Sequence, residues 1–266
     1  MPLAGLQDVQ IHYTWDGPED APVLVFCNSL GTNLRMWDPQ IADFSKHFRV
    51  LRYDARGFGV STVTPGPYSI AQLSWDLVHL LDALQLDRVH FCGLSMGGMV
   101  GMFLGGNAAK RFHNIVLCNT AAKFGTPETW NARISAVQFG GMKAIASTVI
   151  ERWLTPAYRA SHATETAAAI AMLESANPEG YIANCVAVRD MDLRETLYAV
   201  QVPALVLAGL YDPGATPADG HFLAERIPVA RYVEVPAAHL SNLEARDDFN
   251  RTVLTFLGAG GEPHHG

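Results

Sequence analysis

The chain has 266 residues, which is enough for one large α/β domain with an insertion and too few for two domains of average size. Hydrophobic residues make up 49% of the chain, so a disordered or collagen-like protein is excluded. The net charge of -7 comes from residues of both signs without a long basic run, so we expect no nucleic-acid partner.

The first predicted element is an antiparallel ribbon around Val9–Tyr13, which the turn residues Asp16-Gly17-Pro18 follow. Short apolar runs then alternate with segments of helical period. The predicted buried strands are Val23–Cys27, Val50–Tyr53, Val89–Cys92, Ile115–Cys118, Ala204–Ala208 and Tyr232–Val235. The predicted amphipathic helices are Trp37–Phe48, Ile70–Leu84, Met96–Ala109, Ala218–Ile227 and Asp247–Leu257. This alternation predicts an α/β fold with a mostly parallel, doubly wound sheet and helices on both faces.

From Ala121 to Asp190 the alternation stops. Helical stretches recur there, at Thr129–Phe139, Met142–Trp153 and His162–Ala176, and no convincing strand is present. We expect an inserted helical cap over residues 121–190, on a core formed by residues 1–120 and 191–266. Because the insertion falls between two predicted strands, it would cover the carboxyl ends of the sheet, where open α/β sheets bind ligands. The alternative is that these helices only pack outside the core.

No metal, cofactor or membrane segment is predicted. The four cysteines form no Cys-x-x-Cys pair, and the histidines are scattered. No window holds about eighteen uninterrupted apolar residues, and the first residues lack a basic region followed by an apolar stretch, so we expect a cytoplasmic protein. The tail, residues 258–266, is rich in Gly, Pro and His, and we expect it to be frayed, with His264 and His265 solvated.

A candidate nucleophile lies in the segment Val89–Val100. It reads as a strand, then Gly93-Leu94-Ser95-Met96-Gly97, then a helix. A serine at such a tight strand-to-helix turn needs unusual backbone dihedrals, which neighbouring glycines permit, and its hydroxyl projects above the sheet. A glycine-rich nucleotide-binding turn is the alternative, but no P-loop lysine and no Gly-x-Gly-x-x-Gly run accompany it. The pattern favours the nucleophile elbow of an α/β-hydrolase, with Ser95 as nucleophile.

A serine nucleophile needs a histidine base that is held by a carboxylate, and in this fold the three follow in the order Ser, Asp, His. His239 follows the last predicted strand, and Asp212 follows the strand Ala204–Ala208. We therefore predict a catalytic triad of Ser95, Asp212 and His239. The competing residues are His221, which falls in a predicted helix, Asp190 and Asp192, and Asp212 could also be a turn residue before Pro213.

The oxyanion of such a reaction needs two backbone amides. One would come from Met96, directly after the nucleophile. The other would come from Leu30, in the loop that follows Val23–Cys27. The side chains of Asn28 and Ser29 could assist or could serve only the turn.

Segments along the whole chain resemble one family. They are Asn28–Thr32, Gly66–Ile70, Phe91–Gly98, Cys118–Lys123, Arg152-Trp153 and Gly180–Cys185. Together they resemble the 3-oxoadipate enol-lactonases, and the match includes the cap. The resemblance implies hydrolysis of a five-membered enol-lactone with an acetate arm to 3-oxoadipate, in bacterial breakdown of protocatechuate or catechol. One departure is Phe58, where the family usually has histidine in Asp-x-Arg-Gly-His-Gly-x-Ser; we expect altered loop packing there and retained chemistry.

The implied partner is a small anionic lactone, whose carboxylate calls for an arginine. Within the cap, Arg133 and Arg152 are the first candidates, followed by Lys123 and Arg189, although each could belong to a solvated helix face. The aromatic residues Trp130, Trp153 and Tyr181 are candidate pocket walls, or simply core residues. Nothing in the pattern predicts an oligomeric state.

Other functions remain open at this point. A general carboxylesterase or another lactonase would use the same triad on a larger or neutral ester. A haloalkane dehalogenase is disfavoured because it needs a carboxylate in place of Ser95. A small-molecule receptor could retain both fold and triad with little turnover. Turnover by the unmodified chain, and its loss in Ser95→Ala, separates the enzyme from the receptor.

Overall fold

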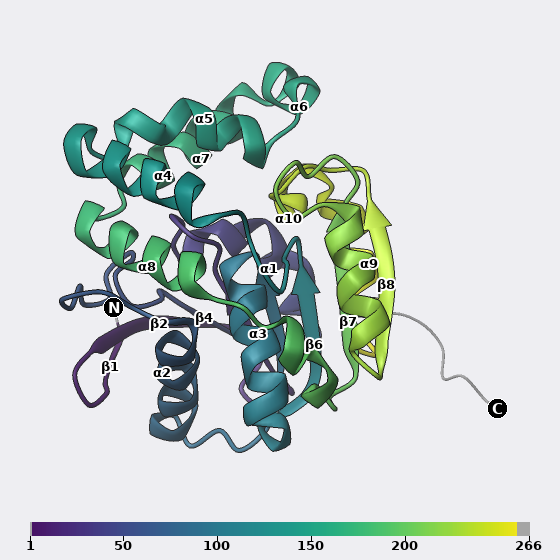
Figure 1. Cartoon of the computed structure of the whole chain (residues 1–266). Helices are drawn as coiled ribbons and strands as arrows, with labels where there is room; N and C mark the ends of the chain where they lie inside the picture. Colours follow the sequence, from purple (N-terminus) through teal and green to yellow (C-terminus); the bar gives the residue numbers. More distant parts are fainter. Residues whose placement is uncertain (1, 260–266) are drawn as a thin grey trace.

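The computed structural model describes residues 2–259, so His264 and His265 lie outside the described residues. One eight-stranded sheet runs through it in the order β1-β2-β4-β3-β5-β6-β7-β8 (Figure 1). The strands are β1 (Leu3–Gly5), β2 (Gln10–Asp16), β3 (Val23–Cys27), β4 (Arg49–Tyr53), β5 (Val89–Leu94), β6 (Phe112–Cys118), β7 (Ala204–Gly209) and β8 (Ala230–Val235). β2 pairs antiparallel with β1 and β4, and every pair from β4 to β8 is parallel. The doubly wound, mostly parallel sheet predicted from the alternation is therefore present.

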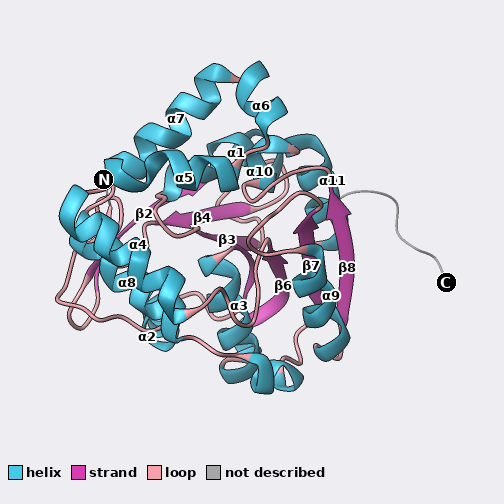
Figure 2. Ribbon diagram, turned by 45° about the horizontal axis from the view of Figure 1, so that its top comes forward, coloured by secondary structure: helices cyan, strands magenta, loops and turns pink. Residues whose placement is uncertain are grey.

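Helices cover both faces of this sheet (Figure 2). α2 and α3 pack together on one face, where α9 also lies, and α1 packs with α11 on the other. The core helices are α1 (Asp38–Phe44), α2 (Ile70–Ala83), α3 (Met96–Asn107), α9 (Pro217–Arg226), α10 (Ser241–Glu244) and α11 (Arg246–Phe256), and the short 3₁₀ turns are η1 (Leu34–Trp37), η2 (Ala109–Arg111) and η3 (Arg194–Ala199).

The helix predicted over Trp37–Phe48 is wrong at both ends. Trp37 belongs to η1, which the side chain of Asn33 caps by accepting a hydrogen bond from the Arg35 amide. The α-helix starts at Asp38 because a proline occupies its first turn, and it ends at Phe44, before a turn into β4. Apolar residues recur at helical spacing through η1, α1 and the turn before β4, so the periodicity predicted a single helix.

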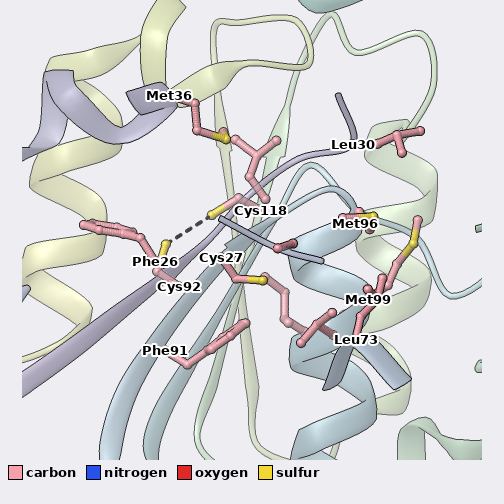
Figure 3. Packing of buried hydrophobic residues seen from close by; sticks show 14 of the residues in the cluster. Phe26, Cys27, Leu30, Met36, Leu73, Phe91, Cys92, Met96, Met99 and Cys118 are labelled. Atoms are coloured by element: carbon pink, nitrogen blue, oxygen red, sulfur yellow. Dashed lines mark hydrogen bonds between the residues drawn. The ribbon is translucent and has the colours of Figure 1, made fainter. Parts of the chain in front are cut away.

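The interior between sheet and helices is closely packed. The central strand residues Phe26, Phe91 and Cys118 are buried with Met99 of α3, as Figure 3 shows. All four cysteines are free and buried thiols, and the Sγ atoms of Cys92 and Cys118 lie 3.9 Å apart. Burial raises the pKa of Cys27 to about 12, so this thiol is protonated at neutral pH.

Five helices fill the insertion between β6 and β7. They are α4 (Pro127–Gly140), α5 (Lys143–Trp153), α6 (Pro156–Ser161), α7 (Ala163–Glu174) and α8 (Pro178–Asp190). In Figure 1, α4 to α7 lie beyond the end of the sheet toward which the arrowheads of β6 and β8 point. We propose that this layer is the cap predicted for residues 121–190.

The last helix of the insertion, α8, contacts the core directly. A Cβ on Gly180 would lie 2.1 Å from the carbonyl oxygen of Gly57, so only glycine permits this contact of α8 with the loop after β4. Asn184 of α8 donates a hydrogen bond to the Arg56 carbonyl at 3.0 Å. Among residues 2–259, no helix is both long and apolar enough to cross a membrane.

Candidate active site

Ser95 stands on a strained turn between β5 and α3. Its backbone has φ 56° and ψ -112°, a conformation that a non-glycine residue holds only when the surroundings fix it. The surroundings are hydrogen bonds on both sides of the residue: the Ser95 amide donates to the Cys118 carbonyl at 2.8 Å, and the Thr120 hydroxyl donates to the Ser95 carbonyl at 2.8 Å. β6 therefore holds the turn that presents the serine.

The two glycines of the motif allow a close backbone approach. A Cβ on Gly93 would lie 2.3 Å from the Gly97 carbonyl oxygen, and one on Gly97 would lie 2.2 Å from the Cys27 carbonyl oxygen. The first contact closes the turn around Ser95. The second brings the start of α3 against the end of β3, and so places the loop that contains Leu30 beside the serine.

His239 and Asp212 lie next to each other at the carboxyl ends of β8 and β7. His239 Nδ1 is 2.7 Å from Asp212 Oδ2. An ionised carboxylate only accepts hydrogen bonds, so Nδ1 carries a proton, and Nε2 is the ring nitrogen that can take a proton from Ser95. Asp212, His239 and Ser95 are 3%, 7% and 6% exposed, so all three side chains are largely shielded from water.

Asn119 completes the surroundings of the carboxylate, and sequence reasoning missed it. It follows β6 with a positive φ of 45°. Its Nδ2 donates to Asp212 Oδ2 at 3.0 Å and to the Ala238 carbonyl at 3.1 Å, so one amide touches the segments on both sides of the Asp212–His239 pair. Ser241 donates to its Oδ1 at 2.5 Å, which fixes the orientation of the amide. A polar residue directly after a predicted strand was the available signal.

The pKa of Asp212 is lowered although burial by itself would raise it. Desolvation opposes ionisation, but the charge of His239, its hydrogen bond, the Gly214 amide and the Asn119 amide together outweigh that effect. Two of the supporting donors are backbone amides: Gly214 N at 2.8 Å and Ala215 N at 3.1 Å from Oδ1. Asp212 is therefore a carboxylate at neutral pH.

The loop that carries His239 is hydrogen-bonded to the insertion between β6 and β7. The Leu240 amide donates to the Trp153 carbonyl at 2.9 Å. Glu244 accepts hydrogen bonds from the Ala238 amide at 2.9 Å and from the Thr155 amide at 3.2 Å, and it also accepts from the Thr155 hydroxyl. The junction of α5 and α6 and the flanks of His239 therefore form one hydrogen-bonded unit.

The two amides predicted for the oxyanion are Leu30 and Met96. Leu30 lies after β3 and lines the same cavity as Ser95, and Met96 is the first residue of α3. Within the described part of the chain neither amide donates a hydrogen bond, so both are available to an anion. Asn28 is not available, because its side chain donates to the Tyr53 carbonyl at 2.8 Å and accepts from Trp37 Nε1 at 3.0 Å.

Ser95 and His239 open into a small cavity of about 40 Å³ beneath the insertion helices. The five candidate substrate-binding residues all line it: Trp130, Arg133, Arg152, Trp153 and Tyr181. A second cavity of about 240 Å³, the α4–α5 cleft, shares Phe124, Trp130, Arg133, Val149 and Arg152 with it. The two cavities therefore adjoin, and both arginines lie where they meet.

Arg133 and Arg152 bring two positive charges to this cavity. No salt bridge involves either residue among residues 2–259. The guanidinium of Arg133 lies 4.8 Å from the ring centre of Trp130. Desolvation and the charge of Arg133 lower the pKa of Arg152, as expected where two cations approach each other without an acid between them. Such a site favours an anion.

The other candidates lie elsewhere and are engaged by other groups. Lys123 donates to the carbonyls of Arg189 and Met191, and Arg189 pairs with Asp190. Asp192 pairs with Arg194, and His221 lies 3.7 Å from Glu234 on the outer side of β8. None of these residues lines the cavity around Ser95.

Phe58 is buried in the loop after β4, and it packs edge-on against Tyr181 with ring centres 6.4 Å apart. The loop keeps its shape through Asp54, which accepts hydrogen bonds from the Leu34 amide at 2.8 Å and from the Val60 amide at 2.9 Å. Phe58 does not line the cavity itself, but it packs behind Tyr181, which does.

Comparison with known proteins decides the family. The model of the α/β hydrolase fold family matches residues 22–245. The 3-oxoadipate enol-lactonase 2 of Acinetobacter baylyi is 41% identical over 93% of this chain and 92% of its own length, and enol-lactonase 1 of the same organism is 38% identical over 91% of each. The chain belongs to the 3-oxoadipate enol-lactonase family of α/β hydrolases.

A solved structure agrees with this assignment. The crystal structure of the enol-lactonase from Burkholderia xenovorans LB400 is 46% identical and superposes with a TM-score of 0.95, over 97% of this chain and all of that one. The predicted fold class and the predicted family are confirmed, and the chain is a hydrolase. No cluster of three or more His, Cys, Asp or Glu side chains that could hold a metal ion is present in residues 2–259.

Proposed function

We propose that this chain hydrolyses 3-oxoadipate enol-lactone to 3-oxoadipate through an acyl-enzyme on Ser95, as a step in bacterial breakdown of protocatechuate or catechol. The observation that carries the proposal is one cavity with two kinds of group in it. Ser95 and His239 line it as nucleophile and base, and Arg133 and Arg152 line it as uncompensated cations. The likeness to the family's enol-lactonases supports the same substrate.

The reaction begins with attack of Ser95 Oγ on the lactone carbonyl while His239 Nε2 takes the hydroxyl proton. Asp212 holds the imidazolium that forms, because its carboxylate already accepts the Nδ1 proton at 2.7 Å. The amides of Leu30 and Met96 stabilise the oxyanion. The ring carbon–oxygen bond then breaks, and the enol oxygen leaves, taking its proton from His239.

The leaving enol stays attached because the ester bond is part of a ring. A water molecule that His239 deprotonates attacks the acyl carbon, the bond to Ser95 Oγ breaks, and the serine recovers its proton. The product is the open-chain acid in its enol form, which becomes the 3-oxo acid by proton transfer. An enol is a better leaving group than an alkyl alcohol, so ring opening needs little assistance.

The acetate arm of the lactone supplies the negative charge that Arg133 and Arg152 bind. A guanidinium holds a carboxylate by charge-assisted hydrogen bonds, each contributing about 1.5–3 kcal/mol. Both arginines also line the α4–α5 cleft, so they lie between that cleft and the cavity that contains Ser95. Binding by this pair orients the ring, with its carbonyl toward the oxyanion amides.

The test compares the anionic lactone with a neutral ester. Loss of lactone absorbance gives kcat/KM for the lactone, and release of nitrophenol gives it for p-nitrophenyl acetate. We expect a preference for the lactone, and we expect Arg133→Ala and Arg152→Ala each to raise KM for the lactone about tenfold or more while changing the aryl ester little.

The matched control is Arg189→Ala. It removes the same charge from the same insertion, but Arg189 does not line the cavity, so lactone kinetics should stay at the level of the unmodified chain. A rate for the lactone no better than for the aryl ester would replace the proposal with a general carboxylesterase. Binding of the lactone without turnover would instead favour a receptor.

A further inference from the structure

A third cavity, distinct from the α4–α5 cleft, shares a single lining residue with the cavity around Ser95. It has a volume of about 480 Å³ and lies between α7, the η1–α1 segment and α10, and we call it the α7 cleft. Its walls include Met36, Met172, Leu240 and Leu243. Trp153 is the one lining residue that it shares with the cavity around Ser95.

Trp153 lies where the two cavities meet, and hydrogen bonds of the backbone fix its position in the chain. It is the last residue of α5, 5% exposed, and its carbonyl accepts the hydrogen bond from the Leu240 amide, next to His239. Two residues further on, Thr155 is bound to Glu244. α5 and α7 also pack against each other in the insertion (Figures 1 and 2). The backbone at Trp153 is therefore tied to the loop that carries His239, and its buried side chain stands between the two cavities.

The two cavities that Trp153 separates differ greatly in volume. The space beside Ser95 is about 40 Å³, whereas the α7 cleft, at about 480 Å³, has room for an extended apolar chain. Trp130, the other tryptophan of the cavity, donates its Nε1 proton to the Phe124 carbonyl at 2.6 Å, while Trp153 Nε1 donates to no group in the described part of the chain. The position of Trp153 therefore depends on packing and on its backbone.

We propose that Trp153 is a specificity-determining residue: it closes the catalytic cavity toward the α7 cleft and thereby restricts the enzyme to short acyl groups. The inference rests on the proposed function, because it takes Ser95 as the nucleophile that is acylated. Shortening Trp153 joins the two spaces and gives a linear acyl chain on Ser95 a place in the α7 cleft.

The experiment measures kcat/KM for p-nitrophenyl acetate and p-nitrophenyl octanoate. In Trp153→Ala we expect the octanoate-to-acetate ratio to rise at least about tenfold over the unmodified chain, because each methylene taken up by an apolar pocket favours binding. In Trp153→Phe, which keeps an aromatic wall, the ratio should change less than about threefold. Trp153→Leu is a second opening variant with a smaller packing defect, and we expect an intermediate rise.

A change in the α7 cleft supplies the matched control. Ala168 lies on α7, is exposed, and lines the α7 cleft but not the catalytic cavity. Ala168→Trp alone should leave both esters unaffected, and Trp153→Ala with Ala168→Trp should return the ratio toward that of the unmodified chain. This reversal identifies the α7 cleft as the place of the longer acyl chain.

Failure of the role proposed for Trp153 can be distinguished from failure of the proposed lactone hydrolysis. A ratio that stays unchanged in both Trp153→Ala and Trp153→Leu, while acetate is still hydrolysed, overturns the inference and leaves the proposed function intact. A raised ratio that Ala168→Trp fails to reverse overturns the assignment to the α7 cleft. If the unmodified chain hydrolyses neither ester nor the lactone, the proposed function fails and the inference fails with it.

Discussion

Asp212 has the most complete hydrogen-bonding environment among the candidate catalytic residues. One of its oxygens accepts from His239 and Asn119, and the other accepts from the amides of Gly214 and Ala215. Four donors around one carboxylate fix both its charge and its direction. The imidazole is thereby held in the tautomer that leaves Nε2 free, so under the proposed function the reactivity of Ser95 depends on Asp212 through His239.

Asp212→Asn tests this dependence. An amide can donate to Nδ1 and so favours the wrong tautomer, and we expect kcat for the lactone to fall about 10⁴-fold with little change in fold. Steady-state kinetics on the lactone provide the measurement, and circular dichroism checks the fold. A decrease of less than about tenfold would contradict the role given to Asp212.

The same substitution has a pH signature in stability. The folded pKa of Asp212 is lower than its unfolded value, so its contribution is fully present above the unfolded value near 4 and is lost as the pH falls through the lower folded value. Urea unfolding from pH 6 to 3 should show the unmodified chain losing stability relative to Asp212→Asn only below about pH 4. A difference that is constant across this range would contradict the lowered pKa.

The sequence predicted Ser95, Asp212 and His239 because each follows a recognisable strand, and the carboxyl ends of parallel strands meet at one edge of the sheet. Asn119 has a similar position after β6, but its contact with Asp212 joins residues 93 apart in the chain. Nothing local shows which of several polar residues at that edge makes the contact. The sequence ranked Arg133 and Arg152 ahead of Lys123 and Arg189, but it could not show that the last two side chains are engaged by other groups of the insertion.

Among the secondary-structure elements, the turn at Ser95 depends on close backbone contact between α3 and the end of β3. Gly97 lies in the first turn of α3 and touches the end of β3 and the start of the following loop, since a Cβ there would lie 2.2 Å from the Cys27 carbonyl oxygen and 3.1 Å from that of Asn28. That loop contains Leu30, the second candidate oxyanion amide. The spacing between the two oxyanion amides therefore depends on the missing side chain at Gly97.

Gly97→Ala should separate α3 from β3. We expect a loss of about 1–3 kcal/mol in the free energy of unfolding and at least a tenfold lower kcat on p-nitrophenyl acetate. The matched control is Gly106→Ala in the same helix, where a Cβ would lie in ordinary contact with Ala199 at 3.4 Å. There we expect unchanged activity and an unchanged or slightly higher stability. Equal effects of the two substitutions in urea unfolding and kinetics would contradict the close approach at Gly97.

The elements of the core were predictable where a pattern is local, as in the strand, turn and helix around Ser95. Two insertion helices, α6 and α8, were not predicted, although Thr155-Pro156 and Asn177-Pro178 carry the capping residue and proline that begin a helix. Their apolar faces are short or irregular, so periodicity did not mark them. The three residues of β1 are too few to show an alternation.

For the whole molecule, the insertion and the core together form one cavity. The core supplies Ser95, Asp212 and His239 from three different strand ends, and the insertion supplies the arginines and tryptophans that face them. The two parts are joined at the α5–α6 junction, where Glu244 accepts a hydrogen bond from the Thr155 amide and the Leu240 amide donates to the Trp153 carbonyl. Sequence patterns predicted that an insertion exists and where it begins, but its orientation follows from contacts such as Gly180 on Gly57, which no periodicity reveals.

If Ser95 opens the enol-lactone, turnover of the lactone must be lost in Ser95→Ala and retained by the unmodified chain. With both proteins shown to be folded by circular dichroism, absorbance at the lactone band gives the two rates. We expect rapid loss of absorbance with the unmodified chain and a rate at least about 10⁴-fold lower with Ser95→Ala. A variant that keeps more than about a tenth of the activity would contradict it.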